Sequence, residues 1–171
     1  GTRFDWTSLV RQVSQADGPG FLTTESGKDL DGRTGFGLCS EFGLRKAHGY
    51  DACAQGERFS KIGVGSLCSL GKKRYKFHHP YTEHLPARIE LDFDRSQARM
   101  CAESPAGTPF PWRLARTWTV RGNELECVIQ LENTGTETME TEEYCHNFLV
   151  PPGGSLGCKG TALRASSPYR F

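Results

Sequence analysis

A chain of 171 residues is long enough for one domain with a substantial core and too short for two. Its 21 Lys and Arg nearly balance 20 Asp and Glu, so the overall charge gives no electrostatic case for a nucleic-acid partner. No apolar run approaches the roughly 18 residues of a membrane-spanning helix, and the N-terminus has no signal-like segment, so we expect no membrane span.

The composition favours an all-β fold, because glycine, proline and strand-preferring residues are frequent and helical periods are few. Residues 2–13 suggest a strand pair or one irregular strand, and residues 17–37 suggest a loop. The apolar, glycine-punctuated residues 59–70 are typical of a strand with a bulge. A segment at 75–81 follows, and residues 89–93 alternate as a short strand.

The clearest strand pattern lies within residues 112–147. One face of its first strand carries three apolar residues, Leu114, Trp118 and Val120. After a turn, the next strand carries four at alternate positions, Leu125, Cys127, Ile129 and Leu131. The pattern predicts a hairpin with one apolar face. A second turn at 133–135 and a strand at 139–148 would complete an antiparallel meander.

The composition changes after residue 150. Residues 151–171 are rich in Pro, Gly, Ser and Ala and contain no Asp or Glu. A tail of this kind is either a flexible extension or a segment that orders against a partner. The sequence therefore divides into a domain at residues 1–150 and a tail at residues 151–171.

Seven cysteines are spread at long intervals, without the paired spacing of a zinc site. They are Cys39, Cys53, Cys68, Cys101, Cys127, Cys145 and Cys158. An odd number without compact spacing suits a reducing compartment, in which cysteine acts as a small buried apolar residue. We therefore expect an intracellular protein without a structural zinc.

The motif HHPYTEH brings several metal-ligand types close together. His78, His79, His84 and Glu83 lie within seven residues of one another. Pro80 breaks any helical register, however, and no further ligand is evident in the sequence. We therefore expect no metal and no other cofactor.

The segment TEEYCHNFL at residues 141–149 is the most informative part of the chain. In a strand, alternation places Glu142, Tyr144, His146 and Phe148 on one face. A face with a carboxylate, a phenol and an imidazole is not a plain core face, because buried polar groups need partners. It is either the lining of a cleft or a stretch of interior that holds a satisfied histidine.

Five segments follow one another along the chain. They are GTRFDW at 1–6, SEFGL at 40–44, GYDACAQGERFSKIGVG at 49–65, LENTG at 131–135 and EEYCHNFL at 142–149. In this order they resemble the galactose mutarotase-like superfamily, which includes the aldose 1-epimerases. The resemblance covers residues 1–150. It implies a large antiparallel β-sandwich with a sugar cleft on the concave face of one sheet.

The resemblance also implies a chemistry, the interconversion of sugar anomers. One group must protonate the ring oxygen while another takes the proton from the anomeric hydroxyl. A histidine suits the acid role, because its unperturbed pKa of about 6.5 lets it exchange a proton near neutrality. In the family the acid lies on the strand that resembles EEYCHNFL, so the resemblance assigns this role to His146.

The family's base is a glutamate nearer the C-terminus, and this chain departs from that pattern. Its last carboxylate side chain is Glu143, so no later residue supplies the base. We therefore expect an incomplete sandwich without efficient catalysis. Three explanations stay open: a fragment of a longer protein, a truncated protein that is no longer catalytic, or a fold completed by a second chain.

Three further side chains are candidate ligands of a sugar or sugar phosphate. Tyr144 is the neighbour of His146 on the strand face. Lys61 lies in SKIGVG, where the family brings polar residues to the cleft, and is either a ligand of hydroxyls or phosphate or a solvated lysine. Glu41 either binds hydroxyls or pairs with Arg45.

Two functions are compatible with these features. The first is a carbohydrate-binding, aldose 1-epimerase-like protein without efficient catalysis. The second is an epimerase-like domain recruited as a structural subunit of a larger assembly, which covers an open sheet edge and binds the tail at 151–171. The tryptophans at positions 6, 112 and 118 either stack on sugar rings or pack in the core.

Overall fold

The computed structural model describes residues 2–25 and 34–150, except for the side chains of residues 83–85. The tail predicted at residues 151–171 lies outside this range. The regular structure consists of β1 (Leu38–Phe42), η1 (Tyr50–Ala52, a 3-10 turn), β2 (Gln55–Lys61), β3 (Gly65–Leu70), β4 (Glu83–Pro86), β5 (Arg88–Phe93), β6 (Gln97–Glu103), β7 (Trp112–Arg121), β8 (Glu124–Asn133) and β9 (Glu143–Asn147). The described residues contain no α-helix, and the predicted all-β class is confirmed.

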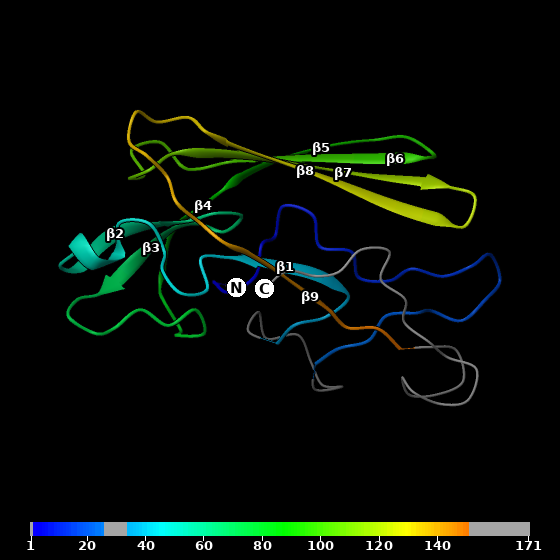
Figure 1. Ribbon diagram of the computed structural model, residues 1–171, viewed down its shortest axis with the longest axis horizontal. Helices are drawn as coiled ribbons and strands as arrows, with labels where there is room; N and C mark the ends of the chain where they lie inside the picture. The colour runs from blue at the N-terminus through cyan, green and yellow to red at the C-terminus, as the bar shows by residue number, and fades with distance from the viewer. Residues whose placement is uncertain (1, 26–33, 151–171) are drawn as a thin grey trace.

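All the strands pair antiparallel, in three sheets. The largest sheet has the order β5-β6-β7-β8, the second has the order β2-β3-β4, and the third is a two-stranded ribbon of β1 and β9. In Figure 1 the four-stranded sheet forms one layer along the top of the view, and the smaller sheets lie beneath it. This arrangement is consistent with a β-sandwich.

The predicted hairpin is β7–β8. Its register places Leu114 opposite Leu131 and Trp118 opposite Cys127, so the apolar residues of both strands share one face. That face points toward the lower layer, because Leu114 packs in one cluster with Phe42 of β1. The alternation of apolar and polar residues therefore correctly identified which face of the hairpin is turned inward.

The predicted meander is wrong in its third strand. Strand β9 pairs with β1 and not with β8, and its ladder runs from Phe42–Glu143 to Leu38–Asn147. Figure 1 shows the reason: the chain that follows β8 leaves the four-stranded sheet and descends to the lower layer. In the lower layer, β9 forms its backbone hydrogen bonds with β1, a strand from the first part of the domain.

Residues 2–13 form no strand, contrary to the prediction. Their backbone meets the β1–β9 ribbon through a bridge between Val10 and Leu38, and the Asp5 N–H donates to the Ser40 carbonyl at 2.9 Å. The N-terminal segment therefore packs along the ribbon as irregular chain and carries its side chains into the space between the layers.

Residues 59–70 contain a hairpin where a single bulged strand was predicted. Strands β2 and β3 meet at a turn in which Gly63 has a φ of 77°. A Cβ atom at this position would lie 2.2 Å from Oδ1 of Asp5. The turn therefore requires glycine, both for its left-handed backbone and for the close approach of Asp5. The segment at 75–81 lies in the loop between β3 and β4.

Two apolar clusters form the core. The first surrounds the β2–β3 hairpin and packs aromatic rings mostly edge to face, among them Tyr50, Phe59, Tyr75 and Tyr81. The second lies between the layers and contains Trp112, which is 1% exposed and donates its indole N–H to Ser60 Oγ at 3.0 Å. Trp112 is thus a core residue with a satisfied polar group.

The apolar face of the four-stranded sheet extends beyond the area that the lower layer covers. Three side chains of β5 remain exposed, Ile89 at 46%, Leu91 at 58% and Phe93 at 71%. Strand pairing puts them on the same face as Leu114. Because β5 is also an edge strand, its backbone hydrogen-bonding groups and these apolar side chains are available together.

Candidate functional site

The β1–β9 ribbon brings three of the predicted site residues to one face. Its register pairs Glu41 with Tyr144 and Cys39 with His146. Directly opposed residues of an antiparallel pair point to the same side of the sheet. Tyr144 and His146 therefore share a face, and Glu41 joins them from the neighbouring strand.

Aromatic rings flank His146 along β9. The imidazole stacks on Phe148 with ring centroids 4.3 Å apart, and the Tyr144 ring approaches it edge-on at 5.4 Å. Tyr144 is 44% exposed, and His146 is half-buried. Nδ1 of His146 is buried and has no hydrogen-bond partner among the described residues. A polar atom without a partner thus lies beside an exposed phenol on this face.

Glu41 and Lys61 form a buried ion pair on the same side of the ribbon. Lys61 Nζ lies 2.9 Å from Glu41 Oε1, and Arg3 Nε lies 3.4 Å from Oε2 of the same carboxylate. The two paired side chains are almost completely inaccessible to solvent. Burial raises the pKa of Glu41 and lowers the pKa of Lys61, while their mutual attraction opposes both shifts.

The Glu41–Lys61 pair differs from two alternatives suggested by the sequence, a solvated Lys61 and a pair between Glu41 and Arg45. Lys61 is not a solvated strand lysine, because its ammonium group is enclosed and also donates to the Phe77 carbonyl at 3.4 Å. Glu41 pairs with Lys61 and Arg3 and not with Arg45. The ribbon therefore gathers all four predicted residues into one region, but two of them satisfy each other.

The opposite face of the ribbon holds a second ionic cluster, which the sequence analysis missed. Arg116 of β7 lies 2.7 Å from Asp5 Oδ2 and 2.9 Å from Glu143 Oε1. The same guanidinium donates to Ser40 Oγ. Arg116 thereby joins the four-stranded sheet to the N-terminal segment and to both strands of the ribbon.

A sequence signal for this cluster exists. Arg116 stands between Leu114 and Trp118 on the face that alternation marks as apolar. A charged residue there needs a buried partner of opposite sign. Its partners Asp5 and Glu143 lie 111 and 27 residues away along the chain, so the sequence indicates the need for a partner without naming it.

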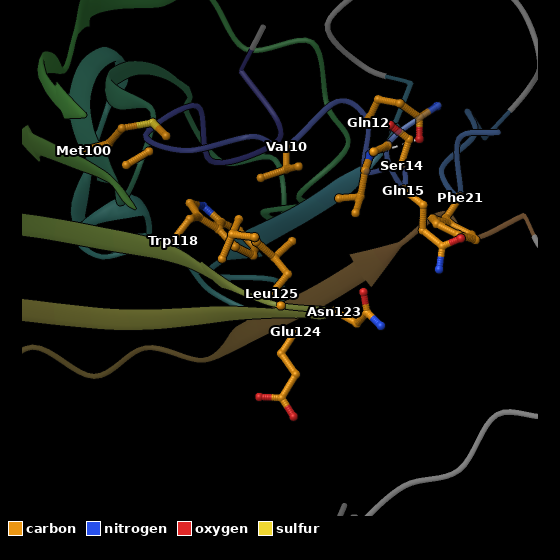
Figure 2. A pocket seen from close by; sticks show the side chains of 15 residues that line it. Val10, Gln12, Ser14, Gln15, Phe21, Met100, Trp118, Asn123, Glu124 and Leu125 are labelled. Atoms are coloured by element: carbon orange, nitrogen blue, oxygen red, sulfur yellow. Dashed lines mark hydrogen bonds between the residues drawn. The ribbon is translucent and has the colours of Figure 1, made fainter. Parts of the chain in front are cut away.

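A groove of about 1050 Å³ opens between residues 10–21 and the ends of β6, β7 and β8. Figure 2 shows Trp118 on the sheet side of this groove and Val10 on the other side. Trp118 is half-buried and donates its indole N–H to Ser8 Oγ at 3.1 Å. Unlike Trp112, it presents part of its ring to an open space.

Cys39 lies directly opposite His146 in the β1–β9 ribbon, and its thiol is unreactive. Its thiol donates to the His146 carbonyl at 2.9 Å, and burial raises the pKa of Cys39 to about 11. The thiol is therefore protonated at neutral pH and a poor nucleophile. The six cysteines of the described ranges are free, and Cys158 lies outside them.

No group of three or more His, Cys, Asp or Glu side chains that could hold a metal ion occurs in the described part of the chain. The rings of His78 and His79 lie 5.6 Å apart, and the side chains of Glu83 and His84 are not described. Within residues 2–25 and 34–150, no helix has the length and apolar character to cross a bilayer.

His146 lies on the aromatic face of the ribbon on which Tyr144 is exposed. Glu41 on that face is engaged by Lys61 and Arg3, and Glu142, which alternation also assigns to that face, accepts the Arg45 N–H. Glu143 is bonded to Arg116 on the other face. The arrangement suits binding better than concerted acid and base chemistry.

Comparison of the chain with protein-family models, with curated proteins and with solved structures found no match.

Proposed function

We propose that this protein binds a saccharide on the Tyr144–His146 face of the β1–β9 ribbon, without efficient interconversion of anomers. The observation that carries the proposal is the exposed Tyr144 ring beside the half-buried imidazole of His146, whose Nδ1 has no hydrogen-bond partner among the described residues. A sugar offers an apolar C–H face for the exposed phenol ring and hydroxyls for the accessible part of the imidazole. The resemblance in the order of sequence motifs points to the same class of ligand.

The expected lack of efficient catalysis follows from the surroundings of His146. Ring opening needs an acid and a base on one carbon, and the carboxylate of Glu41 is held in its buried ion pair. A base on this face would have to be a group other than Glu41. Binding, in contrast, requires only the ring surface and the nitrogen.

Titration calorimetry with D-galactose and D-glucose tests the proposal. We expect His146→Ala to lower the affinity about tenfold, since a good hydrogen bond contributes about 1–1.5 kcal/mol. The control is His78→Ala, because His78 is an exposed histidine of the β3–β4 loop and should leave the affinity unchanged. Equal affinities of all three proteins would contradict the proposal.

Polarimetry tests the catalytic half of the proposal separately. With α-D-glucose or α-D-galactose, we expect a rate of optical rotation change close to that of buffer alone. A rate far above buffer that disappears in His146→Ala would show that a base is present and that the protein is an anomerase.

The rival function, a structural subunit of a larger assembly, also rests on a specific observation. Ile89, Leu91 and Phe93 expose an apolar row on the edge strand β5. A partner strand added at this edge would satisfy the backbone and cover the row. Size-exclusion chromatography distinguishes the two functions: a well-behaved monomer opposes the assembly, and insolubility without a partner favours it.

A further inference from the structure

The loop between β3 and β4 concentrates positive charge. Lys72, Lys73, Arg74 and Lys76 are all exposed, and no Asp or Glu occurs between Glu57 and Glu83 in the sequence. None of the four cations has an ion-pair partner within the described residues. In a chain whose net charge is +1, this loop is therefore a local excess of charge.

The unpaired cations of the β3–β4 loop contrast with basic side chains of the four-stranded sheet. There Arg88 lies 2.6 Å from Glu90, and Arg113 lies 2.7 Å from Glu103. These two cations of the sheet are paired with neighbouring carboxylates. The four cations of the β3–β4 loop have no such partner among the described residues, so their charge is directed to the solvent and to whatever binds there.

Tyrosine hydroxyls fix the backbone of the loop. Tyr50 donates to the Lys73 carbonyl at 2.9 Å, and Tyr81 accepts the Lys76 N–H at 3.2 Å. Tyr75 is buried and donates to the Gly43 carbonyl at 2.7 Å. The cations thus project from an anchored backbone, which lowers the ordering cost of binding.

His79 lies in the same loop as these cations. Its ring is partly withdrawn from water, and this burial, followed by the charges of Lys76, His78 and Lys73, lowers its pKa. Nδ1 of His79 is buried and has no hydrogen-bond partner among the described residues. Several positive groups therefore converge on one part of the loop.

A groove adjoins the cations. It has a volume of about 790 Å³, and Lys72 and Lys73 line one part of it while Asp51 and Gln55 line another. Asp51 is paired with Lys46 at 3.1 Å, so the two lysines are the unpaired charges of the groove. A lining with unpaired cations and an amide matches a ligand that carries both anionic groups and hydroxyls.

We propose that residues 72–79 and the adjoining groove bind an anionic saccharide, whose sulfate or carboxylate groups contact Lys72 and Lys73. The choice of a saccharide rests on the proposed function, whereas the choice of an anion rests on the loop alone. The surface differs from the Tyr144–His146 face and uses none of its residues.

The same features disfavour two other anionic partners. Single-stranded nucleic acid is usually bound by exposed aromatic rings beside basic residues. Here Tyr75 and Tyr81 are buried, and Phe77 is half-buried beneath Arg3. A membrane surface would meet the lysines but would make no use of the groove between Lys72 and Gln55.

Titration calorimetry with a sulfated heparin octasaccharide provides the test. We expect Lys72→Gln/Lys73→Gln to weaken binding about tenfold. The matched control, Arg88→Gln/Arg121→Gln, changes the net charge equally at exposed sites of the sheet and should weaken binding less than about twofold. Lys72→Arg/Lys73→Arg should retain the affinity of the unaltered protein, which separates loss of charge from a disturbed loop.

Three results would overturn the proposal. The first is that the unaltered protein does not bind the octasaccharide, and the second is that both double variants lose affinity equally. The third is that single-stranded DNA or phosphatidylserine vesicles bind more tightly than the octasaccharide. His146→Ala keeps the proposal distinct from the proposed function. Octasaccharide binding that survives His146→Ala, with galactose binding absent in every protein, would support the loop site and refute the site at His146.

Discussion

The β1–β9 ribbon has a buried ionic cluster on each face, and the two clusters contact different parts of the molecule. Arg116 contacts Asp5, Ser40 and Glu143, and so joins the two layers and the N-terminal segment. The Glu41–Lys61 pair lies on the face of Tyr144 and His146 and borders the candidate site. The first cluster links separate parts of the fold, and the second lies beside the face that we propose for binding.

Removal of Arg116 should have the largest effect on stability. Arg116→Met leaves Asp5 buried without its cation, and breaking a buried pair costs about 3–5 kcal/mol. Urea denaturation would measure the loss. The control is Arg113→Met, because Arg113 is on the exposed face of the same strand. Equal midpoints for the two variants would refute the linking role of Arg116.

Removal of the Glu41 charge should cost less. Glu41→Gln leaves Lys61 enclosed without a carboxylate and should lower the free energy of unfolding by about 3 kcal/mol. This value is at the low end for a broken buried pair, because burial already favours the neutral amine of Lys61. Glu41→Gln/Lys61→Met removes both charges and should be more stable than Glu41→Gln alone. The prediction fails if the double variant is the less stable of the two in urea.

A smaller effect should follow from Gly63→Ala, which reaches the Arg116 cluster indirectly. The new Cβ would displace the Asp5 carboxylate, and the left-handed backbone adds strain, for a total of about 2 kcal/mol. Gly56→Ala has a similar φ of 83° but nothing within 4 Å, so it isolates the strain. A thermal melt of both variants checks this, and equal shifts would mean that Asp5 accommodates the methyl group.

The smallest predicted effect concerns His48, which belongs to neither cluster. Burial lowers the pKa of His48, and its Nε2 has no hydrogen-bond partner in the described ranges. The unfolded chain, with a pKa of about 6.5, then binds more protons than the folded chain below that pH. The contribution of His48 to the free energy of unfolding is therefore fully present above about pH 6.5, and it decreases as the pH drops toward the folded pKa of His48.

The pH dependence of the denaturation midpoint checks the role of His48. Between pH 7 and 5 the midpoint should fall less steeply in His48→Gln than in the unaltered protein. The control is His78→Gln, in which an exposed histidine is replaced and the unaltered slope should persist. Identical slopes in all three proteins would show that His48 does not contribute.

The predictable parts of the fold were those with local information. Alternation from Leu114 to Leu131 marks the inner face of β7–β8 without reference to any other segment. Strand β9 was recognised as a strand, but its partner β1 precedes it by about a hundred residues, and no local pattern selects that pairing over a continued meander.

The candidate site, like the fold, could be predicted only where a local sequence pattern was sufficient. The shared face of Tyr144 and His146 follows from the period of a strand. The burial of Lys61 against Glu41 does not, because the pairing depends on how β2 packs against β1. A lysine between Ser60 and Ile62 could equally have faced water.

Ligand contact at His146 is the central prediction for this protein. Nitrogen-detected NMR of the histidine side chains during a titration with D-galactose observes this imidazole separately from the others. We predict a saturable shift of the His146 Nδ1 resonance, with the His48 and His78 resonances unchanged. A titration that leaves His146 unmoved, or moves all three histidines alike, would contradict the account.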